Sequence, residues 1–177
     1  LSQGGLTLGQ KDYYVNNDEA TVAIREAFKK YIADMFKLYG FSAEQAEEKA
    51  QAVFQHETML ALISKSATEL RNPQANYNKM TLKEFQSSYP NLHLEEMCNA
   101  EGIKSEFIQD MIVGQPAFME GLDKITAAES AATLKALMEW DVITSSAAYL
   151  TDEIRECNFD FFGKTMSGRK EDYPLWK

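Results

Sequence analysis

The segment His56-Glu57-Thr58-Met59-Leu60 comes closest in residue types to a catalytic motif. A helical His-Glu-x-x-His places two imidazoles one turn apart to bind zinc, and its Glu acts as the general base. Here Leu60 occupies the position of the second histidine, and the only other histidine is His93. Two scattered histidines do not supply a ligand set, so the sequence predicts no metal site in these residues. The alternative is that His56 is an ordinary surface or interfacial helix residue.

Other side chains that could act as nucleophiles or bases also lack a motif. The serines have no G-x-S-x-G turn around them, and neither Cys98 nor Cys157 lies in a nucleophile motif. The two cysteines can form a disulfide only if their Cα atoms lie within about 7 Å. Otherwise they are two small buried thiols. The 27 carboxylates fit the solvated faces of helices. By themselves, the residues predict no catalytic group.

The sharpest break in the helical pattern is the polar segment Arg71–Thr81, called the corner below. Pro73 lacks an N–H and moves Asn72 out of the α region, so the preceding helix must end before it. Asn76–Asn78 has turn composition, because Asn side chains bond local backbone. Thr81–Glu84 has the Thr-x-x-Glu spacing of a capping box that starts a new helix. The corner is either a structural turn pinned by side chain–backbone bonds or a surface binding loop.

The apolar spacing before the corner predicts two long helices. The first covers about residues 19–39, is capped by Asn17 or Asp18, and ends at Gly40. A second capping box at Ser42–Gln45 begins a helix that runs to about Thr68. The short connection predicts an antiparallel pair. In the loop that precedes them, Tyr13 and Tyr14 are expected to anchor the chain by their rings.

The remaining pattern predicts shorter elements and one further long helix. These are a helix at Leu82–Ser88, a helix capped by Asn91 that ends near Gly102, an extended segment within Ser105–Val113, a helix at Ala117–Lys124, a long helix at about 127–150 behind a third capping box at Thr126–Glu129, and a last helix capped by Asp152 that ends at Gly163 and Ser167–Gly168. The long helix carries the stripe Leu134, Leu137, Met138, Asp141, Val142, Ser145, Ala148 and Tyr149. Together the elements predict an all-α domain of about six to eight helices with at most a trace of β structure.

The composition limits the partners of this chain. It has 177 residues, 45% of them hydrophobic, and a formal net charge of −9. A strongly acidic chain is a poor partner for nucleic acid or an anionic membrane. No apolar run reaches the length that spans a bilayer, and no signal peptide pattern is present. The chain begins at Leu1 without Met, which we interpret as a cut within a longer protein.

Several segments in order resemble the neprilysin-like zinc metallopeptidases, the family of neprilysin, endothelin-converting enzyme and bacterial oligopeptidase O. Gly5–Tyr14 is similar to the family's G-L-G-L-P-x-R-D-Y-Y loop, and the corner is similar to its R-N/D-P…Y-N-K-M-T segment. The matching signature residues are Asp12, Tyr13, Tyr14, Arg71, Asn72, Pro73, Tyr77, Asn78 and Trp140. In the first loop Lys11 replaces an Arg, and a Lys cannot make the planar bidentate contact of Arg.

The resemblance implies that residues 1–177 are a fragment of the N-terminal helical lid lobe of a two-lobed zinc metalloendopeptidase. The family's H-E-x-x-H and E-x-x-x-D motifs lie downstream, so this chain is expected to lack both, to bind no zinc and to be inactive alone. The lobe would cap the active-site cavity, admit peptides and exclude folded proteins. The implied partners are the catalytic lobe of the same chain and, in the parent enzyme, peptide substrates. The implied location is extracytoplasmic: periplasmic, cell-surface or secreted.

A second hypothesis is a stand-alone helical binding or scaffold module derived from the same lobe. The aromatic residues Tyr173 and Trp176 favour the first hypothesis, because they suit docking on a further part of the protein. A stop codon directly after Lys177 would favour the second.

Overall fold

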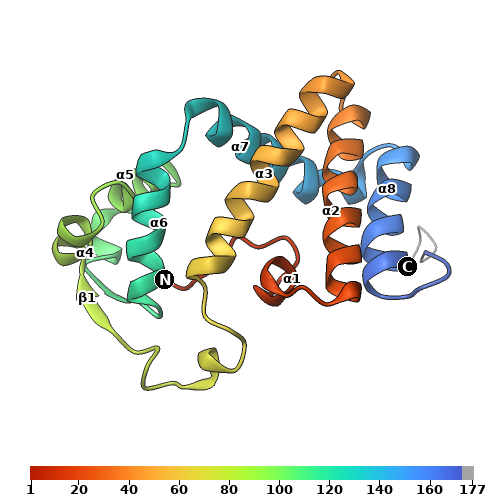
Figure 1. Cartoon of the computed structure of the whole chain (residues 1–177). Helices are drawn as coiled ribbons and strands as arrows, with labels where there is room; N and C mark the ends of the chain where they lie inside the picture. Colours follow the sequence, from red (N-terminus) through yellow and green to blue (C-terminus); the bar gives the residue numbers. More distant parts are fainter. Residues whose placement is uncertain (173–177) are drawn as a thin grey trace. The chain divides into compact units, whose positions relative to one another are not determined.

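The computed structural model describes residues 1–172, and its mainly helical architecture confirms the predicted fold class (Figure 1). Tyr173 and Trp176 lie outside the described residues. The elements are α1 (Asp12–Val15), α2 (Glu19–Leu38), α3 (Ala43–Ile63), η1 (Glu69–Arg71), β1 (Lys79–Thr81), α4 (Leu82–Ser88), α5 (Leu94–Ala100), η2 (Ser105–Phe107), β2 (Asp110–Ile112), α6 (Pro116–Ala128), α7 (Ala131–Ser146), η3 (Ala147–Tyr149), α8 (Asp152–Asn158) and the π-helical turns η4 (Phe159–Met166). Within these elements no helix is long and apolar enough to cross a membrane.

The chain divides into two compact units. The first unit comprises Leu1–Asp12 and Glu57–Glu129, and the second comprises Tyr13–His56 and Ser130–Lys177. Helix α3 contributes residues to both units.

Helix α2 is the centre of the second unit, and both of its ends form as predicted. The Asp18 carboxylate accepts the Thr21 N–H at 3.0 Å, which caps the first turn. At the other end Gly40 has φ 97°, and the Phe41 N–H donates to the Phe36 carbonyl at 3.2 Å. These bonds are a Schellman cap, which requires a residue that tolerates positive φ.

The core of the second unit is an aromatic cluster around α2. The rings of Tyr31 and Phe161 stack with centroids 4.8 Å apart, and the Trp140 ring lies 5.6 Å from Tyr31 and 5.9 Å from Phe36. Aromatic pairs at such distances stabilise a fold beyond the contribution of the apolar surface that they bury. Trp140, from α7, therefore joins two helices of this unit by packing.

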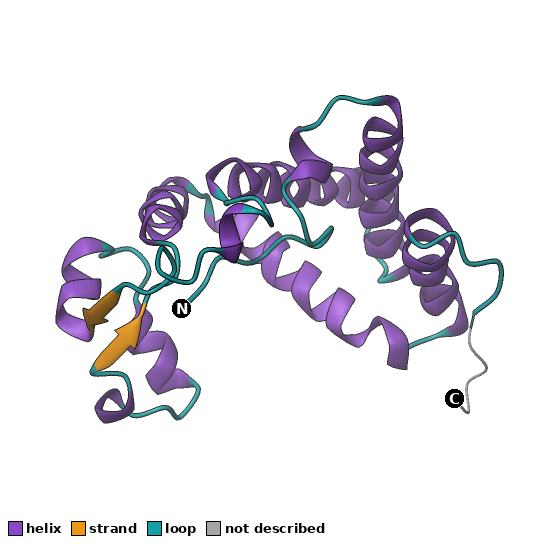
Figure 2. Ribbon diagram, turned by 90° about the horizontal axis from the view of Figure 1, so that it is seen from below, coloured by secondary structure: helices purple, strands orange, loops and turns teal. Residues whose placement is uncertain are grey.

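The first unit has a core of six buried residues and a small antiparallel sheet. The core residues are Leu60, Phe85, Tyr89, Val113, Phe118 and Met119. Strands β1 and β2 pair with Met80 opposite Met111 (Figure 2). The predicted extended segment is thus confirmed for Asp110–Ile112, but its partner strand inside the corner was not predicted. A strand of three residues is too short for an alternating pattern to reveal it.

Two helix boundaries predicted from the sequence are wrong: the C-terminal end of α3 and the start of α7. Helix α3 ends at Ile63 rather than near Thr68, and Ser66 and Glu69 exchange side chain–backbone bonds across the turn that leads into η1. The predicted box at Thr126 lies inside α6. The cap of α7 is Ser130, whose hydroxyl accepts the Thr133 N–H at 3.0 Å. Each true cap lies only a few residues from the predicted boundary.

The remaining caps also differ. Asn91 does not cap α5, because the helix begins only at Leu94 and the Asn91 side-chain Nδ2 donates to the Asp123 carboxylate at 3.0 Å. His93 occupies that cap position with φ 47°. Thr151, rather than Asp152, precedes α8. Gly163 does not end the last helix, because the turns of η4 continue to Met166. A Cβ at Gly163 would lie 2.2 Å from the Phe159 ring, so this position needs glycine for close packing. The end near Gly168 is confirmed by its φ of 64°.

Helix α7 buries a different face from the stripe that marked it in the sequence. The buried residues are Ala136, Trp140 and Ile143, and Ala147 of η3 continues this face. Leu134, Met138, Val142 and Tyr149 of the sequence stripe are exposed.

Candidate functional site

Three asparagines pin the corner. The Asn78 Nδ2 donates to the carbonyls of Ala75 and Val113 at 3.1 and 3.0 Å, and the Asn76 Nδ2 donates to the Leu70 carbonyl at 2.7 Å. The Asn72 Oδ1 accepts the Ala75 N–H at 3.1 Å, as in an Asx turn. For these residues the structural interpretation of the corner holds, because their side chains replace missing backbone partners.

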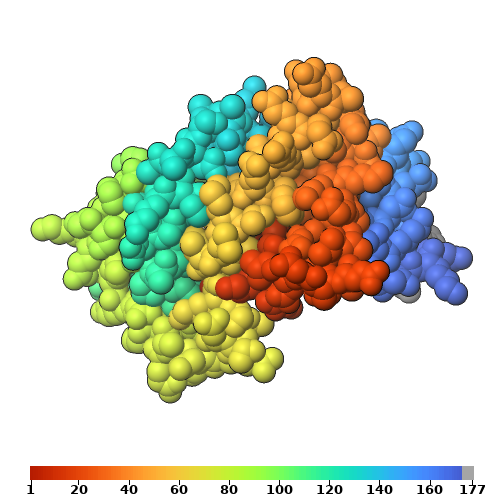
Figure 3. Space-filling view, in the orientation of Figure 1, coloured from red at the N-terminus to blue at the C-terminus, as the bar shows by residue number. Residues whose placement is uncertain are grey.

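Three further corner residues face solvent. Arg71, Pro73 and Tyr77 are exposed, and Tyr77 keeps 64% of its surface accessible. In the space-filling view the segment before and through the corner projects at the lower edge (Figure 3). The surface-loop interpretation therefore fits Arg71, Pro73 and Tyr77, which are accessible to a partner.

The family-signature residues of α1 also include both buried and exposed side chains. Tyr14 is buried, its ring lies 6.2 Å from that of Phe54, and its carbonyl accepts a bond from Arg25 at 2.7 Å. The predicted anchoring role of Tyr14 is confirmed by these contacts. Tyr13 is half-buried, and Asp12 is exposed at the first position of α1.

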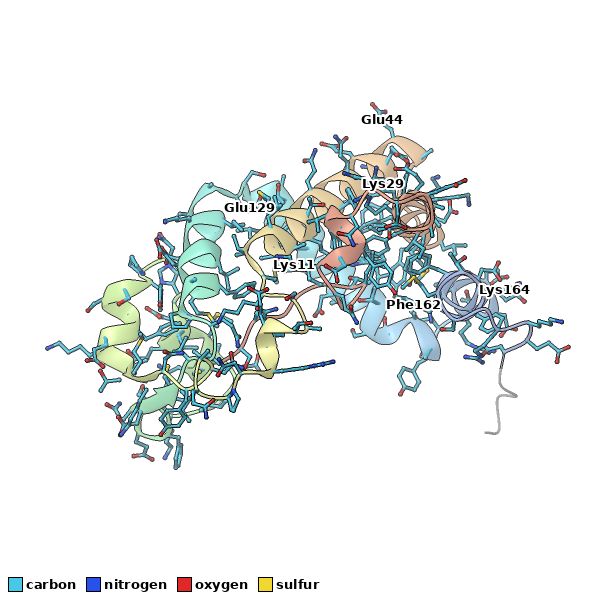
Figure 4. All side chains as sticks on the ribbon, turned by 60° about the horizontal axis from the view of Figure 1, so that its bottom comes forward. Lys11, Lys29, Glu44, Glu129, Phe162 and Lys164 are labelled. Atoms are coloured by element: carbon cyan, nitrogen blue, oxygen red, sulfur yellow. The ribbon has the colours of Figure 1, made fainter. Side chains whose placement is uncertain are left out.

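Residues 1–11, called the strap below, are held against the end of α3. The Thr7 N–H and hydroxyl donate to the Glu57 carboxylate at 3.0 and 2.6 Å. The Lys11 ammonium donates to the Ser64 carbonyl at 2.7 Å, just past the C-terminus of the helix (Figure 4). A cation at this end also complements the helix dipole. A single ammonium suffices for this contact, so the Lys in place of the family's Arg still has a structural partner.

Glu57 and the two histidines do not form a zinc site. Glu57 is 3% exposed and its carboxylate is engaged by Thr7, His56 is half-buried, and His93 is exposed. Among residues 1–172 there is no group of three His, Cys, Asp or Glu side chains that could hold a metal ion. Since the donor set is missing, the described residues do not fit zinc.

The expectation that the sequence contains no E-x-x-x-D pattern is wrong. The pattern occurs at Glu106–Asp110 and again at Glu156–Asp160. Glu106 and Asp110 are both exposed, on η2 and β2. Neither pattern follows a His-Glu-x-x-His, which supplies the histidine ligands of such a site.

A groove of about 520 Å³ lies between α2 and α8 in the second unit. Its charged rim includes Lys30, Asp34 and Glu153, and Cys157 lies in its wall. Burial raises the pKa of the Cys157 thiol to about 11, so the thiol is protonated at neutral pH. The thiolate is the nucleophilic form of cysteine, so the raised pKa disfavours a nucleophilic role for Cys157. Both Cys157 and Cys98 are free and half-buried.

The family model for the N-terminal part of Peptidase family M13 matches residues 1–177, the entire chain. The chain belongs to Peptidase family M13. It is 27% identical to neprilysin-2 of Drosophila melanogaster over 180 residues, which cover 100% of this chain and 23% of that protein. It is 23% identical to human endothelin-converting enzyme 1, with 100% of this chain and 23% of that protein covered. This M13 chain thus spans about a quarter of the length of these curated relatives.

Solved structures have the same fold as this M13 chain. The open-state structure of Mycobacterium tuberculosis zinc metalloprotease Zmp1 matches with a TM-score of 0.93 and 25% identity, covering 99% of this chain and 27% of that one. PepO from Lactobacillus rhamnosis matches with a TM-score of 0.73 and 18% identity, covering 93% of this chain and 26% of the other. The second likeness concerns the fold alone.

Sequence reasoning missed most of the strap contacts. The spacing of α3 does place Glu57 on the apolar stripe, which is a signal that this carboxylate is buried. No local pattern indicates Thr7 as its donor, because 50 residues separate the two. The Gln3 side chain also pairs with the backbone of Lys65, at 2.9 Å in both directions, and these two residues are 62 positions apart in sequence.

Proposed function

We propose that residues 1–177 are part of the helical N-terminal lobe of a zinc-dependent M13 metalloendopeptidase, and that zinc and the catalytic groups belong to the rest of that polypeptide. The observation that carries the proposal is the match of 99% of this chain to Zmp1, a zinc metalloprotease, with a TM-score of 0.93. The family membership supports it independently.

In this proposal the chain contributes shape rather than chemical groups. Tyr14 and Trp140 hold the second unit together, and Asn72, Asn76 and Asn78 hold the corner in the first. The lobe caps the active-site cavity and limits the size of substrates, which are peptides. The formal net charge of −9 on residues 1–177 disfavours nucleic acid as a partner of this lobe.

The test starts from the source gene. We expect its reading frame to continue past Lys177 into an H-E-x-x-H followed by E-x-x-x-D. The purified product of the complete gene is then compared with chain 1–177 on a quenched fluorescent peptide, with and without a zinc chelator, and zinc content is measured. We expect chelator-sensitive cleavage and bound zinc only in the complete product.

Two results would contradict this function. One is chelator-sensitive turnover by chain 1–177 itself. The other is a reading frame that contains no zinc motif, which would favour the stand-alone binding or scaffold module. Loss of zinc from the complete product without loss of cleavage would refute the zinc-dependent mechanism.

We also propose an extracytoplasmic location for the parent protein. Its relatives of the neprilysin and endothelin-converting enzyme type support this. Fractionation of the source cells with an antibody to the lobe tests it: the intact protein should be found at the surface, in the periplasm or in the medium. Recovery in the cytoplasm alone would refute this location.

A further inference from the structure

Helix α7 and the turn η3 are apolar on two opposite faces. One face is buried in the second unit, through Ala136, Trp140, Ile143 and Ala147. The other carries four exposed apolar side chains, called the outer face below: Leu134, Met138, Val142 and Tyr149. At 3.6 residues per turn, Leu134, Met138 and Val142 follow one another on adjacent turns.

The outer face is unusually exposed for its composition. Met138, Val142 and Tyr149 keep 72%, 61% and 88% of their surface accessible. Single exposed apolar residues are common, but several on neighbouring turns of one helix mark a contact site. A helix that is hydrophobic all round is a buried one, and α7 approaches that pattern with apolar side chains on both sides, interrupted on the outer side by Asp141 and Ser145.

We propose that the outer face is the docking face for a segment of the same polypeptide that lies beyond residues 1–177. The relatives that contain this region are about four times as long, since the chain covers only 23% of them. A second copy of the chain is a poorer occupant, because two bodies of net charge −9 repel each other. An anionic lipid surface is disfavoured for the same reason. This inference rests on the proposal that the chain is part of a longer enzyme.

The occupant can be identified by photocrosslinking. A benzophenone amino acid replaces Met138 in the product of the complete gene, and the cross-linked peptides are read by mass spectrometry. The matched control places the same probe at Val22 of α2, a single exposed apolar residue with Glu19 and Glu26 one turn away on either side.

We expect the Met138 probe to form a cross-link within one molecule, to a residue outside 1–177, and the Val22 probe to form none there. A cross-link between two molecules would overturn the proposal in favour of a dimer. A cross-link within residues 1–177, or no cross-link to protein, would also overturn it.

A second measurement uses charge. We compare Met138→Lys combined with Val142→Lys against Val22→Lys, in the complete product and in chain 1–177. If the outer face is covered, the double variant should lower the Tm of the complete product by about 4 °C or more. In chain 1–177 it should change the Tm by less than about 1 °C, because both side chains already face water. Equal effects in the two proteins, or no effect in either, would overturn the proposal.

The outcomes separate this inference from the proposed function. A complete product that cleaves peptides but gives no cross-link beyond residue 177 retains the function and refutes the docking face. A product with the expected cross-link but without chelator-sensitive cleavage retains the docking face and refutes the function.

Discussion

Glu57 is a carboxylate in a place where an apolar side chain would be expected. It lies on the buried side of α3 with 3% of its surface exposed. A buried carboxylate is costly unless hydrogen bonds replace its water shell, and Thr7 supplies two of them. Glu57 therefore fixes the strap to the helix rather than serving as the base of an incomplete zinc motif.

The pair Thr7 and Glu57 should be energetically coupled. Thr7→Val removes the hydroxyl donor and leaves the backbone N–H, and we expect it to lower the free energy of unfolding by about 1.5–3 kcal/mol. In a Glu57→Gln background the same change should cost less, because the charged acceptor is gone. Urea unfolding of the four proteins measures this in a double-mutant cycle. Additive effects of the two changes would show that this bond does not hold the strap.

At the scale of the element, helices begin where side chain–backbone hydrogen bonds join two residues that are three positions apart in the chain. Ser42 with Gln45 and Thr81 with Glu84 form the predicted capping boxes, with both bonds of each box present. Thr126 has the same motif but lies inside α6, while Ser130 caps the next helix. A capping motif thus indicates a possible start, and the neighbouring elements decide which of two adjacent candidates is used.

The position of the α7 cap can be tested by a matched pair of substitutions. Ser130→Ala removes the acceptor of the Thr133 N–H and should lower the free energy of unfolding by about 1 kcal/mol. Thr126→Ala should change it by less than about 0.5 kcal/mol, because alanine is the better helix former within a helix. Thermal or urea unfolding measures both. A larger loss from Thr126→Ala than from Ser130→Ala would restore the boundary predicted from the sequence.

The Thr81–Glu84 box should make stability depend on pH in the acid range. Hydrogen bonds from the Thr81 backbone and then its side chain hold the pKa of Glu84 below its ordinary value of 4.5. A lowered folded-state pKa contributes stability that is present above that ordinary value and is lost as the pH falls through the folded-state pKa. The difference in urea midpoint between the native protein and Glu84→Gln should therefore be constant from pH 7 to about 5 and shrink below about 4.5.

The matched control for this prediction is Glu47→Gln, a change at an exposed position of α3. It removes a carboxylate without removing a cap, so it should not reproduce the acid-range difference. A Glu84→Gln difference that stays the same down to pH 3 would mean that the carboxylate does not stabilise the start of α4.

At the scale of the whole molecule, the proposed lid role predicts selection by substrate size. The product of the complete gene should cleave a short peptide readily. The same sequence placed in an exposed loop of a stable folded protein should be cleaved at least about 100-fold more slowly, which corresponds to roughly 2.7 kcal/mol. Initial rates at equal concentrations measure the ratio. A chemically unfolded carrier protein is the control, because a long unfolded chain can still thread into a cavity. It therefore distinguishes exclusion by the size of a folded substrate from poor accessibility of the cleavage site.

Equal rates on the free peptide and on the folded carrier would contradict the lid role without contradicting peptidase activity. The acidic charge of the lobe provides a related control. Varying ionic strength should change the rates for basic peptides more than for neutral ones, since screening weakens attraction between exposed charges.

The sequence by itself determined the features that depend on near neighbours in the chain. The caps at Asp18, Ser42 and Thr81, the Gly40 stop and the turn-forming role of Asn78 all rest on bonds or backbone angles within a few residues. The all-α class followed from the apolar periodicity, and the family resemblance followed from ordered motifs.

Only the tertiary structure decided the features that depend on distant partners. Helix α7 is apolar on two faces, so its periodicity could not say which face is buried, and the packing of Trp140 on Tyr31 chose the one opposite to Met138. Strand β1 exists because β2 pairs with it, and Glu57 is tolerated in the core because Thr7 bonds to it. Such contacts join residues far apart in the chain, and their energies come from burial that no local pattern records.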